Sequence, residues 1–169
     1  MIQELIELRN NILQGRYPEA LELIDELEGM SRKAILRTIK SFLIRLLIHL
    51  IKNQIEQRLT NSWIASISDS IIQIQDLNLQ ENKKSHYIKI NEWDEMLQEA
   101  FVASIRPASV EVLNGTLKPN QLAQQIAQDQ IISMAKQLLN LTYQHSPTVL
   151  PDVIDQYLGQ LPGGEEWFL

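Results

Sequence analysis

Two polar residues one helical turn apart, Arg45 and His49, are the first candidates for chemistry, because they interrupt the most apolar stretch of the sequence. On one helix face they could bind an anion, or act as electrostatic stabiliser and general base. An acid from the preceding segment, such as Glu26, would complete such a site. The alternative is structural: both side chains reach the core boundary, or pair with the acids Asp25, Glu26 and Glu28. We favour the structural alternative, because an unpaired internal charge is expensive.

The other motifs give little support for catalysis or metal binding. The three histidines, His49, His86 and His145, lie on different segments, and none has an H-x-x-x-H, H-E-x-x-H or E-x-x-H spacing. The chain has no cysteine, so a thiolate metal site is excluded. It also has no glycine-rich phosphate loop and no G-x-S-x-G elbow. We expect no metal site and no cofactor, and His49, Arg45 and Glu26 remain the only catalytic candidates.

Arg45 and His49 belong to residues 31–59, which the apolar spacing predicts to be one long central helix. A first seam recurs at spacings of three and four: Leu36, Ile39, Leu43, Leu46 and Leu50. A second seam lies beside it: Ile44, Leu47, Ile48, Ile51, Ile55 and Leu59. A helix with two seams must be covered from two directions. The apolar run 42–51 is too short for a membrane span, which needs ~20 residues.

The remaining sequence predicts shorter helices around this one. Their expected ranges are 2–14, 18–28, 62–77, 92–113, 120–143 and 151–158. Gly29 is expected to end the helix at 18–28, and the short join Gly29-Met30 would fold that helix sharply back on the central one. We expect a kink or a break at Pro107. The predicted fold is all-α, a bundle of about five or six helices around a central helix at about 32–59.

The amino-acid composition changes near the end of the sequence. Residues 146–169 hold three of the six prolines and three of the six glycines. We therefore expect a helical bundle domain at 1–145 and a C-terminal tail at 146–169, with a short helix that packs on the bundle or a partner. Trp167, Phe168 and Leu169 are costly to expose, so we expect them to dock on this domain, a second copy or another partner.

Charge is uneven along a chain whose net charge is −6. Residues 1–30 hold seven acids and two arginines, whereas residues 31–60 hold seven bases and only Glu56 as an acid. The two segments could neutralise each other inside one domain, or the basic ridge could be exposed to a polyanion. The acidic start of the sequence does not resemble a secretory signal, and we expect a cytoplasmic protein without a membrane span.

The run from Leu23 to Trp63 resembles the domain-of-unknown-function family twenty-nine, which is abundant in cyanobacteria. In that family an acidic helix with the pattern L-x-E-E-I-E-x-M/L-G-R precedes a helix carrying L-L-x-H-L-L-K and then Ser-Trp. The matching positions here are Glu26, Glu28, Met30, Arg32, Leu46, Leu47, His49, Leu50, Lys52, Ser62 and Trp63. The resemblance covers residues 5–75 and implies an all-helical bacterial protein inside the cell. It implies no activity, because the family has none assigned.

These observations favour a non-enzymatic scaffold or protein-interaction module, as a homo-oligomer such as a dimer or bound to another protein. One alternative is a nucleic-acid-associated regulatory protein, for example of toxin–antitoxin type, that uses the basic ridge of the central helix. A second alternative is an enzyme with a site at His49 and Arg45. Exposure of the ridge would favour the first alternative, and an open cleft at His49 the second.

Overall fold

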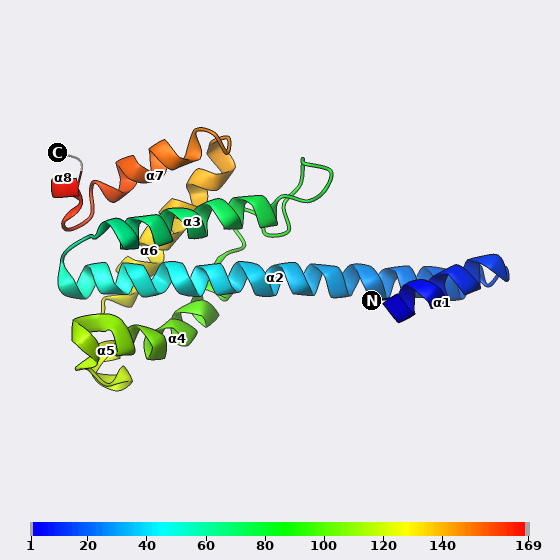
Figure 1. Ribbon diagram of the computed structural model, residues 1–169, viewed down its shortest axis with the longest axis horizontal. Coiled ribbons are helices and arrows are strands. Elements are labelled where there is room, and N and C mark those ends of the chain that lie inside the picture. The colour runs from blue at the N-terminus through cyan, green and yellow to red at the C-terminus, as the bar shows by residue number, and fades with distance from the viewer. Residues whose placement is uncertain (1, 168–169) are drawn as a thin grey trace. The chain divides into compact units, whose positions relative to one another are not determined.

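The computed structural model describes residues 2–167, and the chain divides into two compact units, Met1–Thr38 and Ile39–Leu169 (Figure 1). The described residues form eight α-helices and one short 3₁₀-helix. In chain order these are α1 (Ile2–Leu13), α2 (Tyr17–Glu56), α3 (Asn61–Asn78), α4 (Asp94–Glu111), η1 (Val112–Gly115), α5 (Pro119–Gln125), α6 (Gln128–Gln144), α7 (Leu150–Leu158) and α8 (Gly164–Trp167). The predicted all-α class is confirmed.

The central helix is longer than predicted. α2 is one helix of 40 residues that begins in the first unit and continues into the second. The predicted break at Gly29-Met30 is therefore wrong, and residues 18–28 do not fold back on the residues that follow. A glycine inside a helix costs only about 1 kcal/mol relative to alanine, and good helix formers on both sides outweigh that cost. The acidic and basic segments consequently follow each other along one helix.

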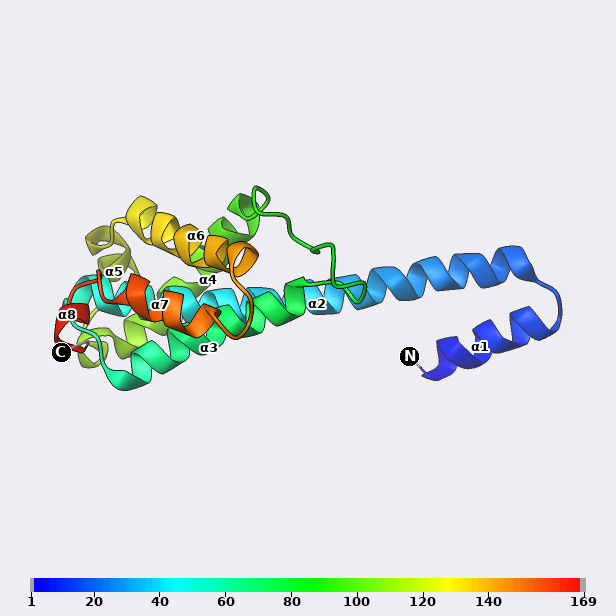
Figure 2. The same cartoon turned by 90° about the horizontal axis from the view of Figure 1, so that it is seen from above.

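The first unit is an antiparallel helical hairpin, in which α1 runs back beside the start of α2 (Figure 2). Its turn uses Gly15, whose φ of +73° lies in the left-handed region that favours glycine. Arg16 fixes the turn, because its Nε and Nη2 donate to Asn11 Oδ1 at 3.0 and 2.9 Å. Among the described residues of this unit only Asn11, Ala20 and Leu23 are buried.

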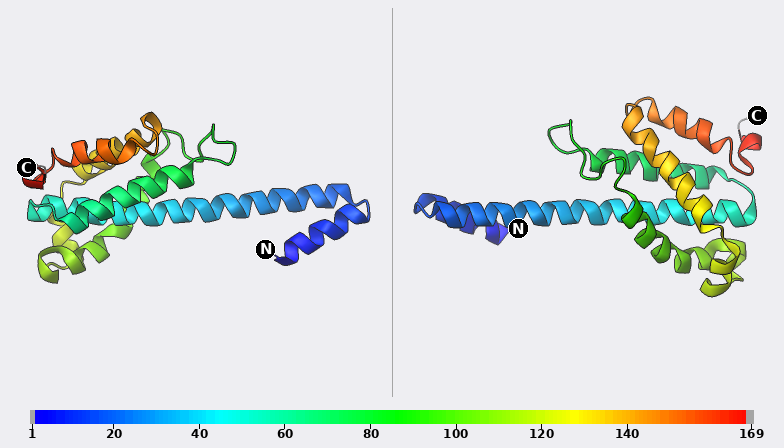
Figure 3. Two further views of the ribbon diagram at one scale, coloured as in Figure 1. Left: turned by 45° about the horizontal axis from the view of Figure 1, so that its top comes forward. Right: turned by 180° about the vertical axis from the view of Figure 1, so that it is seen from behind.

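The second unit has a larger core built on the C-terminal part of α2. Six of its α2 side chains are fully buried: Ile39, Leu43, Leu46, Leu47, Leu50 and Ile51. In Figures 1 and 3, α3 and α4 flank this part of α2 on two sides. α6 and α7 pack on α3 and on each other. Burial from two directions is what the two apolar seams predicted.

Two further helix boundaries differ from prediction. The expected helix at 120–143 is two helices, because the backbone of Ile126 and Ala127 leaves the helical region. Gln54 of α2 stabilises this junction by accepting a hydrogen bond from the Ala127 N–H at 2.9 Å. A break at Pro107 does not occur, since α4 continues through that residue to Glu111.

The segment around Gly163 is held close to the corner between α2 and α3. Gly163 has φ +79°, and a Cβ there would lie 2.7 Å from the Leu59 nitrogen, so no other residue fits without a shift. Trp167 is partly exposed, while Phe168 and Leu169 lie outside the described residues. The division into a domain at 1–145 and a tail at 146–169 stays a prediction. No helix between residues 2 and 167 combines the length and apolarity needed to cross a membrane.

Candidate functional site

His49, the first sequence-predicted candidate, is a partly buried residue of α2. Burial, and then the nearby charge of Lys52, lower the pKa of His49 to about 4, so its imidazole is neutral near pH 7. Its Nδ1 atom is buried and has no hydrogen-bond partner among residues 2–167. The charged groups that act on it are Lys52, Glu111 and Arg45, and none of them belongs to residues 25–28, from which we expected a partner.

Arg45, the second candidate, is bound at the surface of the second unit. Its Nη1 lies 3.2 Å from Asp69 Oδ2, and its Nη2 donates to Ser66 Oγ at 3.1 Å. Both partners come from α3. Because nearly half of each charged side chain is exposed, this ion pair contributes little to stability. Glu26, the third candidate, belongs to the first unit, whereas Arg45 and His49 belong to the second.

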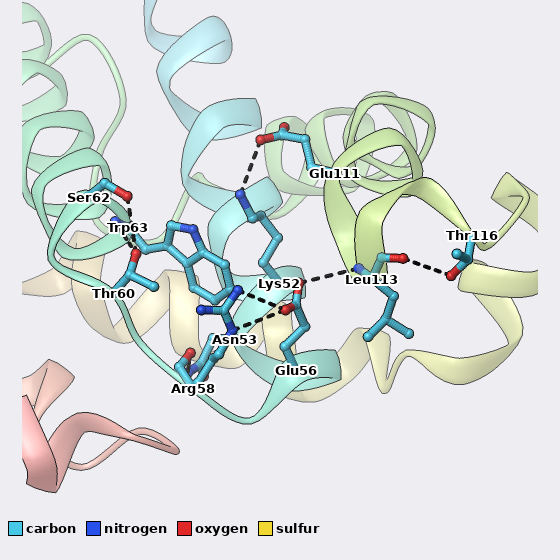
Figure 4. Close-up of polar contacts among 10 residues, drawn as sticks. All are labelled: Lys52, Asn53, Glu56, Arg58, Thr60, Ser62, Trp63, Glu111, Leu113 and Thr116. Carbon is cyan, nitrogen blue, oxygen red and sulfur yellow. Dashed lines mark hydrogen bonds and ion pairs between the residues drawn. The ribbon is translucent and has the colours of Figure 1, made fainter.

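A better-defined polar cluster lies one turn after His49, at the point where α2, α3 and α4 meet (Figure 4). Lys52 is only 7% exposed, and its Nζ lies 3.1 Å from Glu111 Oε1. The same Nζ lies 4.6 Å from the ring centroid of the buried Trp63. The Arg58 guanidinium is 4.7 Å from that ring. We call Lys52, Trp63, Arg58 and Glu111 the lysine–tryptophan cluster.

Hydrogen bonds around this cluster fix the corner between α2 and α3. Thr60 caps α3, because its hydroxyl accepts a hydrogen bond from the Trp63 N–H at 3.1 Å. Asn53 Nδ2 donates to the carbonyls of Arg58 and Pro162 at 3.1 and 2.9 Å, and so joins the corner to the C-terminal segment. The buried Lys52 of α2 thus contacts a carboxylate of α4 and an aromatic ring of α3. We call this link between the three helices a structural clasp.

A second surface of interest lies on the hairpin of the first unit. Large apolar side chains are exposed along it: Ile2, Leu5, Ile6, Ile12, Leu13, Tyr17 and Leu21. Ile2 and Leu13, near the two ends of α1, are 78% and 76% exposed. The sequence pattern showed that this helix has a broad apolar face. It did not show that the face stays uncovered within its own unit.

The structure also brings together two histidines that the sequence keeps apart. His86 and His145 line one cleft together with Asp76. No spacing rule could find this pair, because the two residues are far apart in the sequence and meet only through tertiary packing. A second groove lies between α4 and α5, with Phe101, Ile105 and Ile126 among its lining residues.

The fold and these sites define an all-α protein with a structural clasp at its central helix and an apolar N-terminal hairpin. The family model described as "Domain of unknown function DUF29" matches residues 13–144. The chain therefore belongs to this family, as the residues from Leu23 to Trp63 indicated. No curated protein and no solved structure matches the chain significantly.

Proposed function

We propose that this protein is a non-enzymatic interaction module that pairs with a second copy of itself through its N-terminal hairpin. The observation that carries the proposal is the set of seven large apolar side chains that the hairpin exposes. Side chains of this size are costly to leave in water, so a surface with so many of them favours a partner.

The size of the hairpin supports the same conclusion. The first unit ends at residue 38, and among its described residues, 2–38, the buried apolar ones are Ala20 and Leu23 alone. Units below about 40 residues usually need disulfides, metals or oligomerisation to be stable. The chain has no cysteine, and residues 2–167 contain no cluster of metal ligands. Apart from the continuation of α2 into the second unit, oligomerisation is therefore the source of stability that remains for this unit.

The charges of α2 favour a second copy as the partner. Asp25 and Glu26 lie four and three residues before Gly29, and Arg32 and Lys33 lie three and four residues after it. These spacings place all five residues on one helix face, and all five are exposed. When two copies cross antiparallel at Gly29, residues equally far before and after it face each other. Asp25 of each copy then faces Lys33 of the other, and Glu26 faces Arg32.

Gly29 itself suits such a crossing. It lies in the middle of a 40-residue helix, where glycine is unfavourable, and a Cβ built on it would meet nothing within 4 Å. No contact inside the chain therefore requires a glycine here, whereas a second helix could approach closely at this position. At 100° per residue, Leu21 lies about 80° from Gly29 around the helix, so the apolar and charged surfaces adjoin.

Sedimentation velocity over a concentration series tests the proposal with two charge-reversal variants. The pair Asp25→Lys and Glu26→Arg makes this face wholly basic, and the pair Arg32→Glu and Lys33→Asp makes it wholly acidic. We expect each variant alone to dimerise at least about tenfold more weakly, because opposite charges become like charges. An equimolar mixture of the two should form a heterodimer.

Gly29→Ala separates an effect on folding from an effect on the dimer. It should raise helix stability in the monomer by about 0.5–1 kcal/mol, yet weaken the dimer by obstructing the crossing. A wild-type chain that stays monomeric at all concentrations would refute self-association. A dimer that survives both charge reversals and Gly29→Ala would refute the crossing at Gly29.

The basic ridge is exposed at Arg32, Lys33, Arg37 and Arg45, which by itself favours the nucleic-acid alternative. We rank that alternative lower because three ridge cations have acidic partners from other helices and the net charge of the chain is −6. Lys40 bonds Glu99 at 2.9 Å, and Arg45 and Lys52 bond Asp69 and Glu111. We therefore expect only non-specific affinity for duplex DNA or RNA, with a Kd of about 10⁻⁴–10⁻⁶ M at physiological salt. A sub-micromolar affinity that falls steeply with salt would reverse this preference.

A further inference from the structure

A cleft of about 400 Å³ lies on the second unit, away from the residues used above. Its walls come from the second half of α3, the loop that follows α3, and the end of α6. Apolar contacts are offered by Ile72, Leu79 and Pro147, and polar ones by Gln73, Gln75, Asp76, His86, Thr142 and His145. This size and this mixture of side chains are typical of small-molecule sites.

The wall that carries His86 is fixed by a buried network. Asn78 is buried at the end of α3, accepts a hydrogen bond from the Ile88 N–H at 2.7 Å, and donates to the Ile88 carbonyl at 2.9 Å. The Tyr143 hydroxyl donates to the same carbonyl and accepts from Trp93 Nε1 at 2.8 Å. The His86 ring packs 4.7 Å from the Tyr143 ring. The loop is therefore held in place by α3 and α6 before any ligand arrives.

The opposite wall is fixed by Gln75. Its Nε2 donates to the carbonyls of Thr142 and His145 at 2.9 and 2.8 Å, and so ties the end of α6 to α3. Both amide protons of Gln75 are thus used within the protein. Its Oε1 atom, which can only accept hydrogen bonds, is the remaining polar atom of this side chain.

The cleft is electronegative for two independent reasons. Among the described residues that line it, Asp76 is the one carboxylate, and none is a lysine or an arginine. In addition, the C-terminal ends of α3 and α6 contribute to this cleft, because Leu79 and His145, the C-cap residues of the two helices, both line it. A helix C-terminus carries about half a negative charge, which attracts cations.

We propose that this cleft binds a small organic cation, a guanidinium or amine carried on a short aliphatic chain. The Asp76 carboxylate and the Gln75 amide oxygen accept hydrogen bonds from the cationic head. The side chains of His86 and His145 add polar contacts, and the aliphatic chain lies against the apolar wall. An organic cation fits better than a metal ion, because among residues 2–167 no three potential ligands, Asp76, His86 and His145 included, are arranged so that they could hold a metal ion together.

Three probes of similar size and different charge test this proposal on the full chain: n-butylguanidinium, neutral n-butylurea and anionic pentanoate. Binding is followed by amide chemical shifts in ¹H–¹⁵N NMR spectra and by calorimetry. We expect saturable shifts at residues 72–79, 86 and 142–147 with n-butylguanidinium at about millimolar concentration. The other two probes should bind at least about tenfold more weakly, because they lack the positive charge.

Asp76→Asn keeps the size of the side chain and removes its charge, and should weaken n-butylguanidinium binding about tenfold. Asp129→Asn, at the exposed start of α6, is the matched control and should leave binding unchanged. Absence of saturable binding at these residues would overturn the proposal. Equal or tighter binding of n-butylurea or pentanoate would also overturn it, as would equal effects of the two asparagine variants.

Discussion

Replacing Glu111 by glutamine should destabilise the second unit, because it leaves the charge of Lys52 without its carboxylate. The Lys52 side chain is 9% exposed and that of Glu111 is 47% exposed, so the pair lies at the boundary of the core. Breaking a fully buried pair costs about 3–5 kcal/mol. Water still reaches Glu111, and the Trp63 face retains a cation–π contact with Lys52 worth about 0.5–2 kcal/mol. We therefore expect Glu111→Gln to cost about 1–2 kcal/mol.

A double-mutant cycle separates the pair from its surroundings. Lys52→Met alone should cost about 1–2 kcal/mol, because it removes the ion pair and the cation–π contact and retains the aliphatic packing. The double variant should be less destabilised than the sum of the single variants, with a coupling energy of about 1 kcal/mol. Urea unfolding followed by tryptophan fluorescence measures these free energies. Protein concentration must be held constant, because the self-association proposed above would shift apparent stability.

The pair of Lys40 and Glu99 provides a matched control on the same two helices, α2 and α4. Its side chains are 36% and 55% exposed, and its N–O distance is 2.9 Å. The same substitutions there should give a coupling below about 0.5 kcal/mol, because solvent screens an exposed pair. Equal coupling in the two cycles, or none at Lys52 and Glu111, would refute burial as the reason why this pair matters.

Two further predictions concern the central helix. Folding lowers the pKa of His49 from 6.5 to about 4. Between these pH values the unfolded chain binds a proton at His49 and the folded chain does not. The free energy of unfolding should therefore fall as the pH decreases through this window. After allowance for partial solvent access the loss is about 1–2 kcal/mol, and it should be absent in His49→Gln when unfolding is compared at pH 7 and pH 4.5. Leu46→Ala removes a fully buried side chain and should cost about 2–5 kcal/mol in urea unfolding, whereas a loss under about 0.5 kcal/mol would contradict its place in the core.

The sequence predicted the core well and the helix ends poorly, for different physical reasons. Burial of Ile39, Leu43, Leu46 and Leu50 follows directly from their spacing, because a repeated apolar stripe has only one way to leave water. The end predicted at Gly29 was a local inference from a single residue. Its cost of about 1 kcal/mol is small compared with the summed helix preference of the residues around it.

Polar partners could not be predicted from the sequence at all. We expected acids just before the basic segment to meet it, but Arg45 meets Asp69 of α3, and Lys52 meets Glu111 of α4. These partners are set by how whole helices pack. A charged side chain can be satisfied by any acid that the packing brings near, so sequence proximity carries little information about pairing.

The residues that carry the family resemblance have two different environments. Lys52 and Trp63 are buried in the clasp, where packing and pairing explain why these residue types are needed. Glu26, Met30 and Arg32 are exposed on the hairpin, around Gly29. Packing within the first unit does not require a family-like pattern on such a surface. The crossing proposed above would pair Glu26 with Arg32 of a second copy, but Gly29 occupies an unspecified position of the family pattern, so the resemblance does not bear on the crossing point.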